Sequence, residues 1–272
     1  SVENNYVKFG GYYWRIIRIN GNGSIRMIYD GTVAHDNGEA SEDRYYSKTN
    51  YNSTASDNMY VGYMYTSGQV HGTGTSSLIK TSNDNFYKDK LINYANYIDT
   101  NTGFCGDRSV ISSNTGTGTG SNYTLYGGYE RLLKSQPSLK CESTSDYYTV
   151  NGSNKGNKAL SYPVGLVTMD EVMYAGYSGG YSNGGYVLTA PNINSYINIG
   201  FNFYTMTPIG FLWPTNWTNG SYAMIYYIDA RAINDVDPQT HYSFGLRPVI
   251  NLKSTLGVNG SGTKNNPFIF TA

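Results

Sequence analysis

The chain has 272 residues, of which 19 are basic and 19 acidic, so its net charge is zero and only 14% of it is charged. This balance removes the usual electrostatic case for nucleic acid as a partner, because phosphate binding needs clustered lysine and arginine. The 29 tyrosines and 32 glycines favour a loop-rich, β-containing fold whose surface is polar through hydroxyls and amides.

The length allows one large domain or two ordinary ones. Neither an internal repeat nor a convincing linker divides the sequence, so a single domain over residues 1–272 is expected. No run approaches the roughly 20 apolar residues of a membrane span. The sequence shows no signal-peptide pattern and no initiator methionine, so we expect an ectodomain whose targeting segment is absent.

The first predicted element is a β-hairpin. Tyr12–Asn20 (YYWRIIRIN) and Ser24–Gly31 (SIRMIYDG) are rich in β-branched and aromatic residues, and the Gly-Asn-Gly turn between them can supply positive φ. From His35 to Thr75 the chain is polar and rich in Gly, Ser and Asn, which predicts loops and short strands.

Two helices are predicted. Leu78–Ile98 carries apolar or aromatic residues at 79, 86, 87, 91, 94, 95 and 98, a spacing that suits an amphipathic helix over at least its second half. A second helix begins at Thr168, which forms a capping-box pattern with Glu171, and Gly176 supplies a C-terminal stop. Between the two, the low-complexity stretch Asn114–Ser121 predicts a flexible loop.

The last third of the chain is predicted to be mainly strands and loops. Strands are expected near Tyr186–Leu188, Asn202–Met206, Tyr222–Ile228 and Gly245–Leu252. Tyr177–Tyr186 is rich in Tyr and Gly and is predicted to be a loop.

The two cysteines, Cys105 and Cys141, lie in polar contexts and are too far apart for a CxxC metal or redox motif. As a disulfide they close a loop of about 36 residues, which chain entropy values at about 3–4 kcal/mol. The alternative is two free thiols. We favour the disulfide because both flanks have an exposed character, and it implies an oxidising compartment.

The segment Leu212–Tyr242 has the most unusual composition. Two apolar stretches, Tyr204–Phe211 and Phe244–Leu252, bracket it, whereas the segment mixes aromatic residues with Asn, Asp, Ser and Thr. Tyr and Trp give rigid amphipathic contact area and short polar residues give adaptable hydrogen bonds, as in a binding paratope. A few aromatic anchors should dominate the binding energy, with Arg231 and the carboxylates supplying orientation and selectivity. The predicted binding residues are Trp213, Asn216, Trp217, Tyr222, Tyr226, Asp229, Arg231, Asn234, Asp235, Asp237, His241 and Tyr242.

Motifs for catalysis are missing from the sequence. His35, His71 and His241 are far apart and none belongs to an HExxH pattern, so no zinc site or other metal site is expected. GxSxG, P-loop and Rossmann fingerprints are also absent. We therefore expect no enzymatic activity and no cofactor.

Two acidic groups leave alternatives open. Asn234, Asp235 and Asp237 offer oxygen ligands to Ca²⁺, but they lack the Glu-Pro-Asn or Gln-Pro-Asp motif of calcium-dependent sugar binding, so a solvated acidic loop is preferred. The other group is the acidic cluster of Glu39, Glu42 and Asp43, since glycoside hydrolysis uses two carboxyl groups at a fixed separation. An exposed acidic loop is the preferred interpretation.

Six motifs occur in order along nearly the whole chain: YWRIIRI, FCGDRS, YPVGLVTMDEVMYAG, YTMTP, FGLRPVINL and GSGTKNNPFIF. In this order they resemble a group of secreted or surface-anchored proteins of Gram-positive bacteria and their phages, which often carry a pilin-like N-terminal helix. Their C-terminal domain is similar to the C-type lectin-like fold, close to the formylglycine-generating-enzyme branch. The resemblance implies an α+β fold with small antiparallel sheets, two flanking helices and long loops. Formylglycine-generating enzymes use cysteines near the C-terminal substrate groove. Both cysteines here fall in the middle of the chain, so that activity is not carried over.

The resemblance also implies how the ends of the chain are arranged. The first and last strands of such a fold pair, so Tyr12–Asn20 and Phe244–Leu252 are expected side by side as antiparallel neighbours. Arg247 is then expected to be a structural arginine that pairs with Asp170 or Glu171. The alternative is a solvated surface arginine.

Some members of this fold belong to diversity-generating retroelements, in which adenine-directed mutagenesis of AAC or AAT codons randomises a C-terminal patch. Most of the predicted binding residues, and also Asn219, can be reached from such a codon. Four residues of the window cannot be reached and are expected to be template constants: Trp213, Trp217, Met224 and Gln239.

Together these observations predict a non-catalytic ligand-binding protein at the bacterial cell surface or outside the cell, bacterial or phage-encoded. Its expected partner is a protein or glycan ligand on another cell or phage target. Nucleic acid is not expected as a partner, and contact with a membrane is expected only through an anchor outside this chain. The alternatives are a fixed carbohydrate-binding adhesin and a pilus-associated structural domain.

Overall fold

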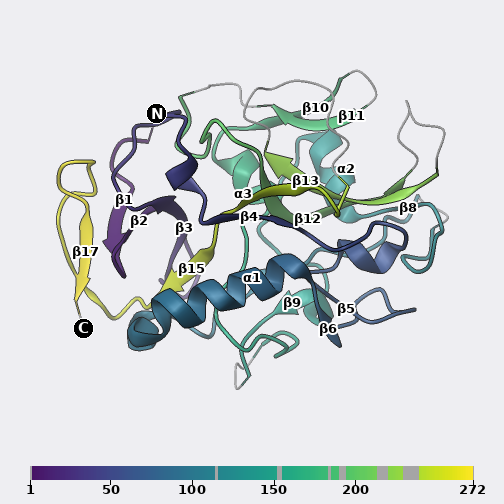
Figure 1. The fold of residues 1–272 in the computed structure, drawn as a ribbon, viewed down its shortest axis with the longest axis horizontal. Helices are drawn as coiled ribbons and strands as arrows, with labels where there is room; N and C mark the ends of the chain where they lie inside the picture. The colour runs from purple at the N-terminus through teal and green to yellow at the C-terminus, as the bar shows by residue number, and fades with distance from the viewer. Residues whose placement is uncertain are drawn as a thin grey trace.

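The computed structural model describes residues 2–113, 116–151, 155–182, 185–189, 194–212, 220–228 and 239–271, and for 178–182 and 185–189 it describes the backbone. These residues form the predicted α+β structure, with mostly small sheets and few helices (Figure 1). The strands are β1 (Tyr6–Phe9), β2 (Tyr12–Ile19), β3 (Ile25–Gly31), β4 (Ser47–Asn50), β5 (Met64–Tyr65), β6 (Thr75–Ser76), β7 (Phe104–Cys105), β8 (Thr124–Leu125), β9 (Tyr147–Tyr148), β10 (Ser178–Ser182), β11 (Gly185–Thr189), β12 (Phe203–Leu212), β13 (Tyr222–Ile228), β14 (Ser243–Leu246), β15 (Val249–Leu252), β16 (Gly257–Asn259) and β17 (Phe268–Thr271). The helices are η1 (Glu42–Arg44), η2 (Asn58–Val61), α1 (Leu78–Phe86), η3 (Tyr87–Leu91), η4 (Ile92–Tyr97), α2 (Gly127–Lys134), α3 (Met169–Tyr174) and η5 (Thr144–Asp146).

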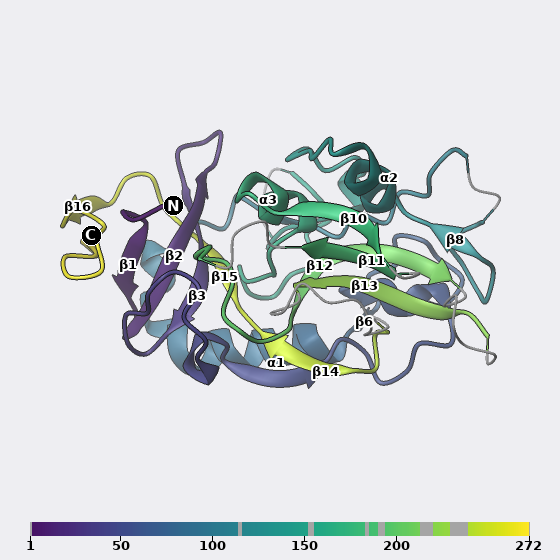
Figure 2. The same ribbon diagram turned by 90° about the horizontal axis from the view of Figure 1, so that it is seen from above.

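Two larger sheets lie toward opposite ends of the molecule, as Figure 1 and Figure 2 both show. The first sheet has the order β15-β3-β2-β1-β17-β16, and the second has the order β10-β11-β13-β12-β14-β4 with β8 paired to β12. Both chain ends belong to the first sheet. β12, which leads into the segment Leu212–Tyr242, and β13, which lies within it, belong to the second. The arrangement therefore separates the chain ends from the segment that the sequence singles out.

The N-terminal hairpin is confirmed. β2 and β3 pair antiparallel from Tyr13 opposite Gly31 to Ile19 opposite Ile25. Gly23 has φ 82° and its N–H donates to the Asn20 carbonyl at 2.8 Å, which closes the turn. Glycine suits this position because side-chain-bearing residues rarely adopt positive φ.

The predicted contact between Tyr12–Asn20 and the C-terminal strand is wrong, because β3 lies between β2 and β15. β15 pairs instead with β3, with Val249 opposite Ile28 and Leu252 opposite Ile25. A short hairpin loop places β3 directly beside β2, so that edge of β2 is already occupied. The chain ends do pair, but through β1 and β17, which run parallel.

The predicted strand Gly245–Leu252 is in fact two strands in different sheets. β14 belongs to the second sheet and β15 to the first, and they are separated at Arg247 and Pro248. Proline has no N–H to donate to a ladder, so Pro248 is a natural point for the chain to leave one sheet and join the other.

Arg247 has the predicted structural role but a different partner. Its Nη2 donates to Asp30 Oδ1 at 2.9 Å, and its Nε donates to the Tyr29 carbonyl at 3.0 Å. The side chain is buried, so the solvated alternative is also wrong. Asp170 and Glu171 pair with other arginines, because α3 packs beside β2, β3 and α2 in this fold.

The helical stretch from Leu78 differs from the predicted form. The regular α-helix occupies its first half, α1, and the second half continues as the π-helical turn η3 and the 3₁₀-helix η4. Phe86 and Leu91 are five residues apart and both fully buried, a spacing that suits the i→i+5 hydrogen bonds of a π turn. α1 also connects two parts of the core, since Ile79 packs in the core of the second sheet and Phe86 in that of the first.

The capping box at the start of α3 is confirmed. Glu171 N donates to Thr168 Oγ1 at 3.2 Å, and Thr168 N donates to Glu171 Oε2 at 2.9 Å. The helix ends at Tyr174, and Gly176 follows with φ 98°, in the left-handed region that favours glycine.

Several elements in the described part of the chain were not predicted, α2 and β10 among them. The α2 sequence begins with two glycines, which conceals a helix, but Gly128 is needed because a Cβ there would lie 2.5 Å from Thr207 Cγ2. Tyr177–Tyr186 was predicted to be a loop, whereas β10 forms there and pairs with β11, so that prediction is wrong. In Asn114–Ser121, residues 114 and 115 lie outside the described residues.

The core combines aromatic rings with buried ion pairs. Trp14 is fully buried and its Nε1 donates to the Phe9 carbonyl. Arginines with at most 1% exposed surface are Arg15, Arg26, Arg44, Arg108 and Arg247, and their carboxylate partners are Asp30, Asp146 and Glu171. Helices long and apolar enough to span a bilayer are not found in the part of the chain that the structure describes.

Candidate functional site

The structure describes part of the predicted binding surface. Of the predicted residues, those outside the described ranges are Trp213, Asn216, Trp217, Asp229, Arg231, Asn234, Asp235 and Asp237. The others come from β13 and from the residues that lead into β14. The structure therefore describes β12, β13 and residues 239–242, which we call the frame of the segment Leu212–Tyr242.

Tyr222, His241 and Tyr242 are half-buried. Tyr222 opens β13 directly opposite Leu212, where the preceding strand ends. The rings of His241 and Tyr242 lie 4.8 Å apart, and Tyr242 also contacts Phe244, with 6.3 Å between ring centroids. These three side chains keep the partial exposure that a binding role needs.

Tyr226 is 1% exposed, so the prediction that its ring is an exposed anchor is wrong. It lies in β13, of which every residue after Tyr222 is buried. Thr205 Oγ1 of the neighbouring strand donates to the Tyr226 carbonyl at 2.6 Å. The structure therefore assigns Tyr226 to the frame, because β13 is covered on both faces.

Tyr204 fixes the return of the chain after the segment. Its hydroxyl lies 3.0 Å from the Gln239 carbonyl and 2.8 Å from the Tyr242 carbonyl. Burial raises the pKa of Tyr204 far above its usual value, so the hydroxyl remains a donor. The position of the Gln239–Tyr242 backbone thus depends on a side chain of β12.

A second set of bonds holds the same return from the other side. Asn50 Nδ2 donates to the His241 carbonyl at 2.6 Å, and Thr240 Oγ1 donates to the Thr54 carbonyl at 2.8 Å. Asn52 N also donates to the Thr240 carbonyl. Residues 239–242 are therefore anchored to both β12 and the loop after β4.

The strand before the segment is equally well fixed. All ten residues of β12 are buried, and the strand pairs with β13, β14 and β8. Its register with β13 shifts on both sides of Pro208, as expected where a proline without an N–H interrupts a ladder. The segment thus leaves and re-enters a rigid sheet.

Cys105 and Cys141 form a disulfide, so their predicted pairing is confirmed. A cavity of about 40 Å³ lies beside this disulfide. Its walls come from β2, β3, α2, α3 and the 138–141 segment. This site was not predicted, because its charged residues are spread over more than 150 positions and no local motif connects them. The motifs FCGDRS and YPVGLVTMDEVMYAG each contribute some of its residues.

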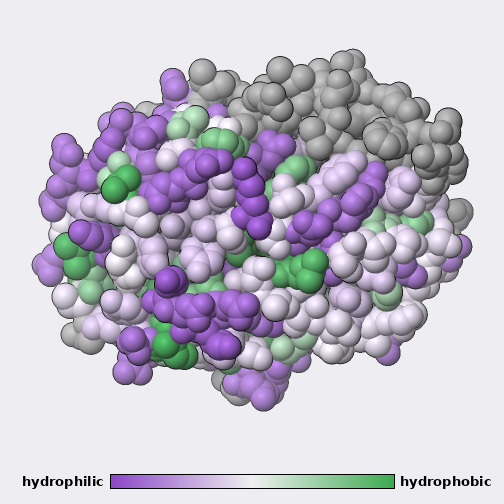
Figure 3. Space-filling view, in the orientation of Figure 1, coloured by the Kyte–Doolittle hydropathy of each residue, from purple (hydrophilic) through white to green (hydrophobic). Residues whose placement is uncertain are grey.

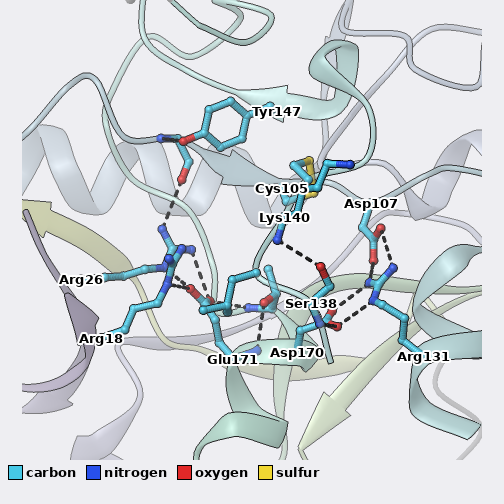
Figure 4. Close-up of a pocket in the computed structure, with 14 residues that line it drawn as sticks. Arg18, Arg26, Cys105, Asp107, Arg131, Ser138, Lys140, Tyr147, Asp170 and Glu171 are labelled. Carbon is cyan, nitrogen blue, oxygen red and sulfur yellow. Dashed lines mark hydrogen bonds and ion pairs between the residues drawn. A yellow bond between two sulfur atoms is a disulfide. The ribbon is translucent and has the colours of Figure 1, made fainter. Parts of the chain in front are cut away.

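The charged groups of the cavity form two clusters of ion pairs (Figure 4). In the first, Glu171 Oε1 lies 2.9 Å from Arg18 Nε and 2.5 Å from Arg26 Nε. Burial tends to raise the pKa of Glu171, but the two arginines outweigh this effect and the pKa is lowered. The Glu171 carboxylate is therefore ionised at neutral pH.

In the second cluster one arginine serves two carboxylates. Arg131 Nε lies 2.7 Å from Asp170 Oδ1, and Arg131 Nη2 is hydrogen-bonded to Asp107 Oδ2. Ser138 N also donates to Asp170 Oδ1 at 2.8 Å, which ties the 138–141 segment to α3. Figure 4 shows this cluster on the opposite side of the cavity from Arg18 and Arg26.

The acidic residues near His35 are more ordered than the predicted exposed loop. His35 Nδ1 lies 2.8 Å from Glu39 Oε1, and its Nε2 lies 3.1 Å from Asp43 Oδ2. A hydrogen bond with His35 is the main cause that lowers the pKa of Glu39. The two carboxylates contact opposite nitrogens of one ring, which is a structural clamp rather than a shared metal site.

Figure 3 shows a face that is mostly polar or of intermediate hydropathy, with apolar residues in separate small spots. Within the described residues, no three His, Cys, Asp or Glu side chains converge as metal ligands would. Comparisons of the chain with protein-family models, with curated proteins and with solved structures each found no match.

Proposed function

We propose that this chain is a non-catalytic, surface-displayed ligand-binding protein, built as one C-type lectin-like domain, and that the segment Leu212–Tyr242 is its binding face. The ligand is a protein or a glycan on another cell or phage target. The disulfide between Cys105 and Cys141 supports a location outside the cytoplasm, because disulfides persist in oxidising compartments.

The contrast between the segment and its frame is the observation that carries this proposal. β12, β13 and residues 239–242 are buried or hydrogen-bonded on several sides. The sequence between them combines Trp and Tyr with short polar residues. Binding loops on a rigid sheet divide the work in the same way, since the sheet fixes the ends and the loops supply the contacts.

The genetic code sorts the positions of the segment, because four of its residues cannot be reached from a mutated Asn codon. Met224 and Gln239 are buried and form a β-bridge with each other, so they belong to the frame. Trp213 and Trp217 are constant anchors within the face. Tyr226 can be reached but is buried, so we assign it to the frame as well. The proposed face consists of Trp213, Asn216, Trp217, Tyr222, Asp229, Arg231, Asn234, Asp235, Asp237, His241 and Tyr242.

The α+β architecture supports the lectin-like part of the proposal at the level of fold class. The resemblance implies that Tyr12–Asn20 and Phe244–Leu252 pair antiparallel, whereas the terminal strands that pair here are β1 and β17, and they run parallel. Small sheets with helices beside them are also in keeping with such a domain. α2 is an addition to the two helices that the resemblance implies.

The first test is to sequence the DNA around the gene and search for a near-copy of the segment beside a reverse-transcriptase gene. We expect the two copies to differ mainly at adenines, in codons of the proposed face such as Tyr222 and Tyr242. The codons of Met224, Tyr226 and Gln239 should be identical in both copies. Differences spread evenly over frame and face codons would contradict diversification.

The second test measures binding directly. The labelled protein is applied to a glycan array and to a panel of purified bacterial surface proteins, and each hit is repeated with Trp217→Ala. We expect Trp217→Ala to weaken binding at least about tenfold, as for a hot-spot aromatic residue. Tyr94→Ala is the matched control, because Tyr94 is 37% exposed and packs on Phe9 in the first sheet.

The outcomes of the binding test separate the proposal from its alternatives. Equal losses for Trp217→Ala and Tyr94→Ala would show that the face lies elsewhere. Hits confined to simple sugars, without a near-copy in the DNA, would indicate a fixed carbohydrate-binding adhesin. Self-association on sizing that Trp217→Ala abolishes would indicate a pilus-associated structural domain.

A further inference from the structure

The cavity beside the disulfide separates its charges into two halves. In the first half two arginines, Arg18 and Arg26, share the single carboxylate of Glu171. In the second half the single arginine Arg131 is shared by Asp107 and Asp170. With every group ionised, the first half carries one excess positive charge and the second carries one excess negative charge.

The two halves are close together, because Asp170 and Glu171 are consecutive residues of α3. Successive side chains of a helix project about 100° apart, so the two carboxylates line different sides of one cavity. A ligand that satisfies both halves must place one charge at each side of a cavity of about 40 Å³, so its charges are only a few bonds apart. The cavity volume of about 40 Å³ leaves space for only a small molecule, since one water needs about 10–15 Å³ on this measure.

Arg18 has hydrogen-bonding capacity that faces the cavity. Its side chain is 27% exposed, and its one recorded hydrogen bond within the described chain runs from Nε to Glu171 Oε1. Its two terminal amino groups can therefore donate to a carboxylate in the parallel, bidentate geometry that guanidinium favours. Lys140 at the rim is 76% exposed, and Glu142 offsets its charge at 3.5 Å, so Arg18 is the cation that a ligand carboxylate would meet.

Asp107 has the corresponding properties on the acidic side. Its Oδ1 accepts one long bond of 3.4 Å from Arg131 Nη1, although the residue is 5% exposed. Its φ is 55°, a left-handed conformation that few non-glycine residues adopt and that is concentrated at functional sites. Aspartate tolerates this conformation, and with it the Asp107 carboxylate forms part of the cavity wall.

We propose that this cavity is a second binding site, separate from the aromatic face, and that it binds a small zwitterion of the free α-amino acid class. The ligand carboxylate pairs with the terminal amino groups of Arg18. The ligand ammonium lies beside Asp107 Oδ1, the oxygen that Arg131 reaches only at 3.4 Å, and offsets the excess negative charge of that half. Each half of the cavity thereby becomes neutral, which neither a simple anion nor a simple cation achieves.

The site should respond to pH. Burial raises the pKa of Asp107 to about 6, although the neighbouring Arg131 opposes this shift and Asp170 and Asp146 reinforce it. Asp107 is ionised above that pH and loses its charge below it. The half of the cavity that binds the ammonium therefore loses negative charge as the pH falls through about 6. The affinity for the zwitterion should fall over the same pH range.

The test uses three probes of similar size, glycine, acetate and methylammonium, titrated calorimetrically into the full chain at pH 7.5. We expect glycine to bind at least about tenfold more tightly than either single-charge probe, since each charge-assisted bond contributes about 1.5–3 kcal/mol. Glycine affinity should also be lower at pH 5 than at pH 7.5. Equal affinities for the three probes, or no binding of glycine, would overturn the proposal.

Two variants test the two halves. Arg18→Gln removes the carboxylate partner but leaves Arg26 on Glu171, and Asp107→Asn removes the ammonium partner while asparagine tolerates the left-handed conformation. Each should weaken glycine binding at least about tenfold, and Asp107→Asn should also abolish the pH dependence. Lys48→Gln is the control, since Lys48 lies in β4, does not line the cavity, and contacts Glu42 and the Tyr45 and Phe201 rings instead. Unchanged glycine binding in both folded variants would overturn the assignment.

Discussion

Buried arginine is the most distinctive residue-level feature of this protein. Asp30 Oδ1 lies 2.9 Å from Arg44 Nε and 2.9 Å from Arg247 Nη2, and Arg15 is 3.7 Å from the other oxygen. Burial lowers the pKa of Arg247, and Asp30 opposes this effect. One carboxylate therefore offsets much of the desolvation cost of several cations at the junction of the two sheets.

Asp30→Asn should be strongly destabilising. The substitution removes the shared negative charge and leaves Arg15, Arg44 and Arg247 buried without it, which costs about 3–5 kcal/mol in comparable cases. Urea unfolding of the variant should show this loss in the free energy of unfolding. Asp36→Asn is the control, because Asp36 is 71% exposed and its pair with Lys264 should contribute about 0–1 kcal/mol. Similar losses for the two variants would contradict the role of Asp30.

At the scale of the element, α3 shows how a short helix depends on its first turn. It has only six residues, so the capping box satisfies a large share of its free backbone donors. Glu171 also joins this cap to the cavity, since the same carboxylate accepts from Thr168 N and pairs with Arg26. Loss of the cap should therefore loosen both the helix and one wall of the cavity.

Thr168→Ala should lower the free energy of unfolding by about 1 kcal/mol, because it removes the acceptor for the Glu171 N–H. Chemical denaturation provides the measurement. Thr168→Ser keeps the hydroxyl and should remain within about 0.5 kcal/mol of the parent. If serine were as destabilising as alanine, the Thr168 methyl group rather than the cap would be responsible.

Elements with strong local signals were predictable from the sequence. The hairpin of β2 and β3 follows from alternating residues and a glycine turn, and α3 follows from its capping box. The division of Gly245–Leu252 between two sheets was not predictable, because it depends on partners that are distant in the chain. The pairing of Arg247 with Asp30 spans 217 positions, and no local pattern reports it.

The candidate sites show the same limit. Composition identified the segment Leu212–Tyr242. It could not distinguish Tyr226, which is buried in the core, from Tyr222, which is half-exposed and lies four residues earlier in the same strand. The sequence of a strand that is covered on both faces shows no alternation of polar and apolar residues. The cavity was not predictable either, because it exists only after several segments have come together.

At the scale of the whole molecule, the disulfide restrains the middle of the chain. The Cys105–Cys141 bond joins β7 to the 138–141 segment, which forms no strand or helix itself and is also held by the hydrogen bond from Ser138 N to Asp170 of α3. Replacing both cysteines with serine should lower the free energy of unfolding by about 3–4 kcal/mol, because it frees a loop of 36 residues in the unfolded chain.

Urea unfolding with and without a reducing agent tests this expectation. The reduced parent protein should match the double-serine variant, and the variant itself should not respond to the reducing agent. A parent protein with the same unfolding midpoint in both conditions would contradict a stabilising role for the disulfide.

The parallel pairing of β1 and β17 has a mechanical consequence. Val7 lies opposite Phe268 and Lys8 opposite Ile269, so the first and last strands of the chain run side by side in the same direction. Force applied between the two termini pulls these strands past each other along their length. Their hydrogen bonds are then loaded together in shear, instead of opening one after another as in a zipper. A protein tethered at one end and dragged at the other would resist extension at this pair of strands before its second sheet is disturbed.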